Sequence, residues 1–194
     1  MSDLLKVKVG GSDYLCKWKN SRYAEIGGRE YPVVKIGNQL WMAENLDYKP
    51  TGVTIGTNAW YYNNDEQTYG YRGLLYSWNG VSAVIDSNSL PSGWRVPSKA
   101  DFDNLVLTVG SDAAKKLKAL SFGGTDDFGF SILNAGSHDS GAFGDGSTGF
   151  WTTSNYSSSA KDAPWFYNNS DNWSWDHITF TDVNAIPVRL VKDT

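Results

Sequence analysis

The sequence predicts a single α+β domain whose N-terminal and C-terminal strands meet in one antiparallel sheet. Segments rich in β-branched and aromatic residues lie near the N-terminus, at 6–18 and 31–42, and near the C-terminus, at 150–154 and 186–191. Two amphipathic helical segments lie between them, and glycine then punctuates a long irregular run at 122–149. Strands at both ends of the chain, with helices between them, favour the α+β class.

Composition narrows the functional classes. A chain of 194 residues is long enough for one domain with a sizeable core. The net charge of -4 argues against nucleic-acid binding, because contacts to the phosphate backbone need a basic face. Cys16 is the single cysteine, so no intrachain disulfide, zinc cluster or dithiol site is expected. Residues 1–6 begin no long apolar run, so we expect no signal peptide, no membrane insertion and synthesis in the cytoplasm.

Residues 1–27 are expected to form a small N-terminal β element. Within it, residues 6–18 alternate charged with apolar side chains around a Gly-Gly pair at 10–11, which predicts a hairpin with one solvated face. This element either extends the edge of the main sheet or attaches the protein to a larger particle. Residues 28–194 are expected to form the main domain, beginning with a second hairpin at 31–42 that has a Gly-Asn turn.

Two helices are predicted in the first half of the main domain. Apolar residues at helical spacing from Tyr71 to Ile85 indicate a short amphipathic helix. The clearest helix begins at Ser98, which is a good N-cap, and Asp101 follows where a carboxylate meets the free amides of the first turn. Gly110 is expected to end this helix.

Ser111 is expected to cap a further helix. Its apolar residues predict an inward face and its lysines a solvated face; the two sets are Ala113, Ala114, Leu117 and Leu120, and Lys115, Lys116 and Lys118. In the glycine-rich run that follows, residues 128–133 are the one strand-like piece.

Residues 154–159 and 165–177 have the composition of a binding surface. They consist largely of Asn, Ser, Asp, Tyr and Trp, in which rings give contact area at low entropic cost and small polar groups give adaptable hydrogen bonds. If residues 165–168 form a strand, Trp165 and Tyr167 lie on one side and Phe166 and Asn168 on the other. The candidate ligand-binding residues are Asn155, Tyr156, Ser157, Trp165, Tyr167, Asn168, Asn169, Asp171, Asn172, Trp173, Trp175, Asp176 and His177.

A plainer interpretation of the same residues stays open, because Asn, Ser and Asp are ordinary turn residues and the tryptophans could be packed. An enzymatic function is not expected. His138 and His177 lie in polar loops without a recognisable nucleophile spacing, so both are interpreted as exposed loop histidines. Carboxylate pairs for glycoside hydrolysis can be drawn from many of the 21 acidic residues, so none is singled out and no catalytic residue is assigned.

Several motifs, in order from Gly28 to Asp193, resemble those of the Fibrobacter succinogenes major paralogous domain. They lie at residues 31–46, 71–78, 91–98, 129–131, 150–154 and 188–193, and include Pro91-Ser92-Gly93-Trp94-Arg95-Val96-Pro97-Ser98 and Phe150-Trp151-Thr152-Thr153-Ser154. The resemblance implies a C-type lectin-like fold, close in architecture to the formylglycine-generating enzymes, with two main helices, small antiparallel sheets and long loops on one face. It also implies that a second polar and aromatic patch borders the candidate surface, namely Trp60, Tyr61, Tyr62, Asn63 and Asn64.

Some bacterial and phage proteins with this fold are variable proteins of diversity-generating retroelements. In these, adenines in the codons of a C-terminal segment are mutated, so Asn codons yield Asn, Ser, Tyr, Asp and similar residues on a fixed scaffold. The composition of residues 155–176, within a variable-type segment at 154–182, resembles such an outcome. The resemblance therefore implies a receptor-binding protein with an exchangeable patch, displayed on a phage virion or a bacterial surface.

Two departures from the family pattern put export in doubt and leave the fold intact. One is at residues 133–139, where Leu-Asn-Ala-Gly-Ser-His-Asp replaces the more usual Leu-Pro-Ala-Gly-Tyr-Arg. The other is that the family commonly has a cysteine before the Pro-Ser-Gly-Trp motif and often an export leader, whereas this chain has Leu90 and no leader is seen. Formylglycine-generating enzymes act through paired cysteines, which Cys16 alone does not supply. The sugar-reading Glu-Pro-Asn or Gln-Pro-Asp triplet of calcium-dependent lectins is absent, so calcium-mediated sugar binding is not expected. No cofactor is assigned, although a structural calcium stays open at the loop carboxylates Asp126, Asp127, Asp139, Asp145, Asp171 and Asp176.

Two functions from different classes are thus compatible with the sequence. In the first, the chain is a ligand-binding module whose partner is a protein or a cell-surface glycan. In the second, it is a non-catalytic structural or surface-attachment domain whose Asn and Ser loops are solvated connections. In either case the protein could assemble as a homo-oligomer or join a larger particle through its N-terminus.

Overall fold

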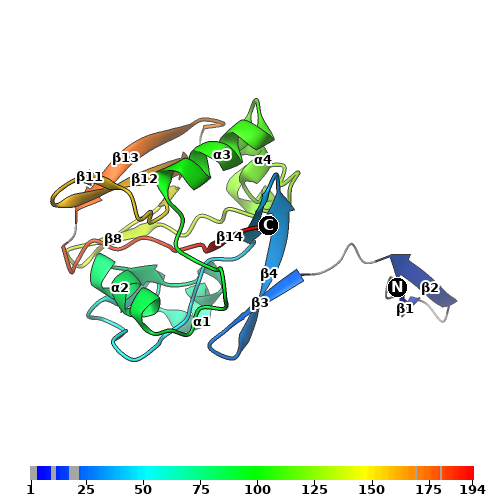
Figure 1. Ribbon diagram of the computed structural model, residues 1–194, viewed down its shortest axis with the longest axis horizontal. Helices are drawn as coiled ribbons and strands as arrows, with labels where there is room; N and C mark the ends of the chain where they lie inside the picture. The colour runs from blue at the N-terminus through cyan, green and yellow to red at the C-terminus, as the bar shows by residue number, and fades with distance from the viewer. Residues whose placement is uncertain (1–3, 10–11, 18–21, 169, 180) are drawn as a thin grey trace.

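The computed structural model describes residues 4–9, 12–17, 22–168, 170–179 and 181–194. The strands are β1 Leu4–Val9, β2 Ser12–Lys17, β3 Arg22–Ile26, β4 Arg29–Ile36, β5 Gln39–Met42, β6 Ala59–Trp60, β7 Leu75–Tyr76, β8 Ser137–Asp139, β9 Ala142–Gly144, β10 Ser147–Gly149, β11 Asn155–Ser157, β12 Ala160–Tyr167, β13 Trp173–Thr179 and β14 Val191–Asp193. The α-helices are α1 Glu66–Tyr69, α2 Trp78–Asp86, α3 Lys99–Val109 and α4 Ala113–Leu117, and the 3-10 helices are η1 Tyr62–Asn64, η2 Gly70–Arg72 and η3 Leu120–Phe122. This mixture of helices and small antiparallel sheets agrees with the predicted α+β class (Figure 1).

The first sheet joins the two halves of the chain in the order β14-β5-β4-β3. The predicted hairpin at 31–42 is confirmed as β4 and β5, and Gly37 in its turn has a φ of 60°. The C-terminal strand β14 pairs with β5, so the expected meeting of the two ends in one sheet is also confirmed. The chain between residues 186 and 190 is extended but forms no strand of its own.

Strand β3 joins this sheet by pairing with β4, and its Ala24 and Ile26 are buried in the core. Residues 27 and 28 therefore lie in the turn of the β3–β4 hairpin. The predicted hairpin at 6–18 is present as the antiparallel pair β1 and β2, which pairs with no other described strand. Residues 10, 11 and 18 lie outside the described part of the chain.

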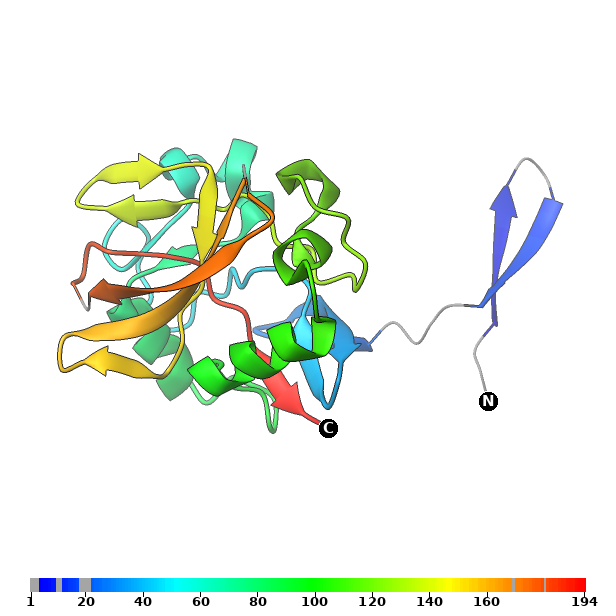
Figure 2. The same ribbon diagram turned by 90° about the horizontal axis from the view of Figure 1, so that it is seen from above.

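The second large sheet contains the candidate surface. Strand β12 lies at its centre, with β13 on one edge and β10 and β11 on the other. Figure 2 shows α3 running beside this sheet, and residues of α3 contact residues of β13. Because helix and sheet are in contact, the candidate segment is backed by a regular element instead of standing free as a loop.

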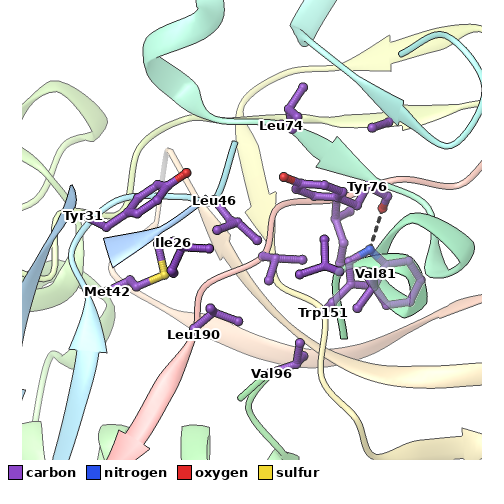
Figure 3. Packing of buried hydrophobic residues seen from close by; sticks show 14 of the residues in the cluster. Ile26, Tyr31, Met42, Leu46, Leu74, Tyr76, Val81, Val96, Trp151 and Leu190 are labelled. Atoms are coloured by element: carbon purple, nitrogen blue, oxygen red, sulfur yellow. Dashed lines mark hydrogen bonds between the residues drawn. The ribbon is translucent and has the colours of Figure 1, made fainter. Parts of the chain in front are cut away.

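Two large apolar clusters hold these parts together. One is centred on Trp151, whose indole N–H donates to the main-chain oxygen of Tyr76 over 2.6 Å (Figure 3). The other contains Trp41, Phe102 and Phe166, and thereby links the first sheet, α3 and β12. A buried indole needs a partner for its N–H, so the bond to Tyr76 fixes the orientation of the largest ring in the first cluster.

Arg189 is buried completely in the space between segments that are distant in sequence. Its guanidinium donates to Asn45 Oδ1 over 2.8 Å, to the Ser131 carbonyl over 2.7 Å and to the carbonyl of Phe130, whose ring it also faces. Burial lowers the pKa of this guanidinium. The five donors of arginine suit such a site, since one side chain satisfies main-chain oxygens of a long loop and an amide near β5.

A charged cluster joins α3 to the first sheet. Arg95 binds both carboxylate oxygens of Asp101 at 2.5 and 2.9 Å and reaches Asp193 on β14 at 3.0 Å. Asp101 also completes a capping box with Ser98, so the predicted start of this helix is confirmed, as is its end at Gly110. Burial alone would raise the pKa of Asp101, but hydrogen bonds from Arg95 and Ser98 outweigh it and lower that pKa to about 2.

Several predicted elements differ in the structure. The helix expected from Tyr71 begins only at Trp78, because Leu75–Tyr76 pairs with β6 and Ser77 caps α2. Helix α4 ends at Leu117, so the helical pattern fails beyond it: Lys118 is buried and Leu120 is exposed, the reverse of the prediction. Residues 128–133 and 150–154 form no strand, although Ile132 makes an isolated bridge to Lys118.

Candidate ligand-binding surface

The register of β12 and β13 decides which candidate residues can act together. Trp173 lies opposite Phe166, Trp175 opposite Pro164, and His177 opposite Asp162. Residues that lie directly opposite in an antiparallel pair project from the same face. Trp173, Trp175 and His177 therefore share the face that packs on α3, while the alternate residues of β13 project from the other face with Trp165 and Tyr167.

On the α3 side, Trp175 attaches the hairpin to the helix, and Trp173 packs beside it. The Trp175 indole N–H donates to Asp103 over 3.0 Å, and the Lys99 ammonium lies 4.0 Å from the centre of the Trp175 rings. Trp173 contacts Trp175 edge-on at 5.6 Å and stacks on Phe166 at 6.1 Å. Both indoles are half-buried against the second cluster, so they contribute to packing as well as to the surface.

Further along the same face, Tyr156 and His177 form an exposed pair that we term the ring platform. Their rings stack with centroids 4.2 Å apart and planes 5° from parallel, across the intervening strand β12. Tyr156 is 60% exposed, and His177 is also exposed. Asp162 lies opposite His177, and Asp176 Oδ1 is 3.4 Å from His177 Nδ1. The platform is therefore an aromatic patch with an acidic edge.

On the opposite face, Trp165 and Tyr167 lie side by side as predicted, with Phe166 on the α3 side. Trp165 is half-buried, and its ring packs flat enough on Gly149 that a Cβ there would lie 2.8 Å from it. Tyr167 is 37% exposed, and its hydroxyl lies 3.1 Å from the Ser174 hydroxyl. On this face the groups open to a ligand thus include the hydroxyls of Tyr167 and Ser174, and no pair of exposed stacked rings is found among the described residues there.

The loop between β12 and β13 is held from behind by α4 and the residue after it. The buried ammonium of Lys118 donates to the carbonyls of Tyr167 and Ser170 over 3.0 and 2.8 Å. Burial lowers the pKa of this ammonium. Lys115 forms an ion pair with Asp171 at 3.2 Å. Fixing the main chain in this way leaves the side chains of the loop free to face solvent, and Asn168 and Asn172 are exposed.

The start of β11 is fixed by Lys161 on β12. Its ammonium donates to the Thr153 carbonyl over 2.9 Å and to Asn155 Oδ1 over 2.6 Å, and it lies 4.3 Å from the centre of the Trp78 rings. Burial lowers the pKa of Lys161. Asn155 therefore positions the edge strand that carries Tyr156, in addition to being exposed itself.

The predicted set thus divides by exposure. The exposed members are Asn155, Tyr156, Ser157, Tyr167, Asn168, Asp171, Asn172, Asp176 and His177, and the half-buried members are Trp165, Trp173 and Trp175. Asn169 lies outside the described residues. The tryptophans of this set are called the anchored tryptophans below.

Sequence reasoning missed the helix residues that complete this region, namely Lys99, Asp103, Lys115 and Lys118. No local signal marks them, since a lysine or aspartate on an amphipathic helix is expected to face water. Asp162 and Ser174 were also missed, but period-two alternation next to the predicted residues could have indicated them.

Two expectations about neighbouring residues are wrong. The rings of Trp60, Tyr61 and Tyr62 are buried instead of bordering the surface, although Asn63 and Asn64 are exposed. His138 is buried as well: its ring stacks on Trp60 at 4.1 Å, and Nδ1 lies 2.7 Å from the Val183 carbonyl. The hydrogen bond and the stacking remove the penalty of burying a polar ring. His177 is exposed as expected.

Among the residues that the structure describes, no group of three or more His, Cys, Asp or Glu side chains is arranged to hold a metal ion. None of the helices in the described part of the chain combines the length and apolarity needed to cross a bilayer.

Comparison with known proteins places the chain in a family. Residues 34–192 match the family described as the Fibrobacter succinogenes major domain, and this match covers most of the chain. No curated protein and no solved structure matches the chain. From the length of the match, this protein belongs to the Fibrobacter succinogenes major domain family.

Proposed function

We propose that this protein is a non-catalytic, ligand-binding member of its family that displays exchangeable residues on a C-type lectin-like scaffold. The scaffold consists of residues 28–194 together with β3, which pairs with β4; the variable-type segment is at 154–182, and the hairpin of β1 and β2 attaches the protein to a phage virion or a bacterial surface. The ligand is a protein or a cell-surface glycan. No cofactor takes part in binding.

The main support for this proposal is that the exposed and the half-buried candidate residues differ in residue type. Every exposed member is Asn, Tyr, Ser, Asp or His, whereas the half-buried members are all Trp. An AAC codon encodes Asn, and replacement of one of its adenines yields the other four exposed types: Tyr by TAC, His by CAC, Asp by GAC and Ser by AGC. Tryptophan has the single codon TGG, which contains no adenine and stays constant under adenine mutagenesis. The side chains that contribute packing are thus the ones that such mutagenesis would spare.

An exchangeable surface also needs a main chain that stays in place when its side chains change, and this structure meets that requirement. The main chain of the β12–β13 loop is fixed by Lys118, and the hairpin is fixed to α3 through Trp175 and Asp103. Exposed substitutions away from such contacts usually change the free energy of unfolding by less than about 0.5 kcal/mol. Apart from Asn155 and Asp171, which bind Lys161 and Lys115, the exposed residues can therefore be exchanged at little cost in stability, and their rings and amides suit recognition.

Paired alanine substitution at the ring platform tests the binding function. The double variant Tyr156→Ala/His177→Ala and the wild type are applied to arrays of bacterial surface proteins and of glycans. We expect at least one array member to lose tenfold or more in affinity, while the double variant remains folded at the assay temperature. Tyr71→Ala is the control, because Tyr71 is 68% exposed and lies outside the candidate segment. Equal binding by both variants and the wild type would favour the structural or surface-attachment function.

Sequencing around the gene tests diversification separately. We expect a near-identical repeat of the codons for residues 154–182 next to a reverse-transcriptase gene, with differences at adenines of the repeat. Variation is expected at Tyr156, Asn168 and His177, and constancy at the codons of the anchored tryptophans. A repeat that differs equally at all nucleotides would contradict this part of the proposal.

A further inference from the structure

A pocket lies next to the second large sheet, between the end of α2 and the start of α3. Its volume is about 570 Å³, which is within the usual range for ligand pockets. Its apolar walls are Ile85, Leu90, Trp94 and Val96, and none of these residues belongs to the candidate surface described above. Ile85 is 39% exposed, so an apolar side chain in the last turn of α2 lies open to the pocket.

The walls of the pocket are built on fixed backbone. Arg95 exchanges both main-chain hydrogen bonds with Val191, at 3.0 and 2.9 Å, and the Trp94 N–H bonds the Pro91 carbonyl at 2.9 Å. Leu90 and Trp94 pack against the first core cluster, and Val96 is buried within it. A pocket whose walls are held in this way is already formed before a ligand arrives, which reduces the entropic cost of binding.

The charge in the pocket lining is balanced by neighbouring carboxylates. Arg95 is the one charged residue in the lining, and its guanidinium is bound to both oxygens of Asp101 and to Asp193. The Ser98 hydroxyl also donates to Asp101, over 2.7 Å. A phosphate or carboxylate group would therefore meet a guanidinium whose charge two carboxylates already balance, whereas an apolar group would lose only water.

The pocket adjoins the second large sheet through Thr153 and Lys99. Thr153, at its rim, bonds the Pro97 carbonyl through its N–H over 2.8 Å, and the Lys99 N–H donates to Ser154 Oγ over 2.9 Å. Thr153 lies two residues before the start of β11, which carries Tyr156. On the other side, Lys99 follows the lining residue Ser98 and covers the Trp175 rings. One partner can thus contact the sheet and the pocket together.

We propose that this pocket receives an apolar or aromatic side chain of a protein ligand that also contacts the ring platform. The inference rests on the proposed binding function and narrows its ligand class to proteins. The side chain fills the pocket between Ile85, Leu90 and Trp94, and the polar surface around it excludes water, as at the centre of other protein interfaces. The pocket belongs to the scaffold, so it supplies constant affinity while the exchangeable residues supply specificity.

Amide chemical shifts of the isotope-labelled full chain test the pocket directly. The probes are N-acetyl-phenylalaninamide, N-acetyl-asparaginamide and methyl glucoside, each titrated into the millimolar range. We expect the phenylalanine probe alone to shift the amides of Ile85, Trp94, Ser98 and Thr153. Equal shifts with the asparagine probe or the glucoside, or no shifts at these amides, would overturn the proposal.

Matched variants show whether the apolar wall is responsible. Ile85→Asp and Asn88→Asp each place a carboxylate in the pocket, and Asn88 has a φ of 52°, which aspartate also tolerates. Both substitutions are expected to lower the affinity for the phenylalanine probe at least tenfold. Ser92→Asp adds the same charge to an exposed residue outside the lining and is expected to leave probe binding unchanged. Unchanged probe binding in Asn88→Asp and Ile85→Asp would contradict the proposed site.

The array separates this inference from the proposed function. For any array protein that loses binding in Tyr156→Ala/His177→Ala, Ile85→Asp is expected to lose at least tenfold in affinity too. Loss in the platform variant without loss in Ile85→Asp overturns the pocket inference and leaves the proposed function standing. If the platform variant loses binding only to glycans on the array, the pocket inference is also overturned, because that inference requires the ligand to be a protein.

Discussion

The Lys118 ammonium donates a hydrogen bond to the carbonyl oxygen of Ser170 over 2.8 Å, although Lys118 itself is completely buried. The two residues belong to different parts of the fold, the end of α4 and the loop after β12. A buried ammonium that is satisfied by main-chain oxygens depends on where the loop backbone runs and not on which side chains the loop carries. The contact therefore fixes the loop independently of its sequence.

Removing this ammonium is expected to loosen the loop. Lys118→Met retains most of the apolar side-chain volume but leaves the carbonyls of Tyr167 and Ser170 without their donor, so we expect a loss of roughly 1–3 kcal/mol in the free energy of unfolding. Urea denaturation measures this loss, and hydrogen exchange should become faster in residues 170–173. Lys116→Met is the control on the same helix, because Lys116 is partly exposed. An equal loss in the control would show that the effect is unrelated to the loop carbonyls.

The rings of the candidate segment are expected to separate into two energetic groups. Trp175→Ala removes a half-buried ring that binds Asp103 and Lys99, so it should lower the free energy of unfolding by roughly 2 kcal/mol or more. Tyr156→Ala and His177→Ala remove exposed rings and should each cost less than about 1 kcal/mol. Chemical denaturation of the three single variants gives the comparison. Similar losses in all three would mean that the platform rings are part of the packing.

The Asp101 carboxylate should make stability depend on acidity. Its pKa is lowered to about 2 in the folded protein, below the ordinary value of 3.8, so the folded state favours the charged form. This contribution is fully present above the unfolded pKa and is lost as the pH falls toward the folded value. A shift of this size corresponds to about 2 kcal/mol. In urea denaturation, Asp101→Asn should be destabilised at pH 7, and its difference from the wild type should shrink between about pH 5 and pH 2.

A control variant shows whether the pH dependence is specific to Asp101. Asp86→Asn changes an exposed carboxylate at the end of α2 and should leave stability nearly unchanged across the same range. If the Asp101→Asn difference stays constant with pH, the carboxylate is not the group whose ionisation stabilises the start of α3.

Gly149 should resist any side chain because of Trp165. A Cβ built at Gly149 lies 2.8 Å from the indole ring, closer than van der Waals contact allows, so Gly149→Ala must displace the ring. We expect a loss of about 1–3 kcal/mol and a change in the near-ultraviolet circular dichroism of the tryptophans. Gly70→Ala is the matched control, because its Cβ would meet only Glu66 Cγ at 3.6 Å. No loss in Gly149→Ala would mean that β10 can move away from β12.

Local chemistry predicted several elements of this fold correctly. The hairpin of β4 and β5 follows from alternation around Gly37-Asn38, and α3 follows from the Ser98 cap with Asp101. These signals are contained within a few residues, so no tertiary contact is needed to interpret them. The prediction failed where a distant partner decides the outcome: Leu75 pairs with Trp60 instead of joining a helix.

The candidate site shows the same limit. Composition identified the segment, and alternation correctly grouped Trp165 with Tyr167. It could not show that Asp103 and Lys99 hold Trp175, because those residues lie on a helix far away in the chain. Nor could composition distinguish the buried His138, stacked on Trp60, from the exposed His177.

The interior arginine has a consequence for how this protein tolerates change. Arg189 ties together residues 42–45 and 130–131, none of which contacts the ring platform. Because these hydrogen bonds use main-chain oxygens and one amide, exchange of the exposed side chains on β11 and β13 does not remove their acceptors. Substitutions can thus accumulate on those strands while the hydrogen bonds that hold the interior arginine are retained.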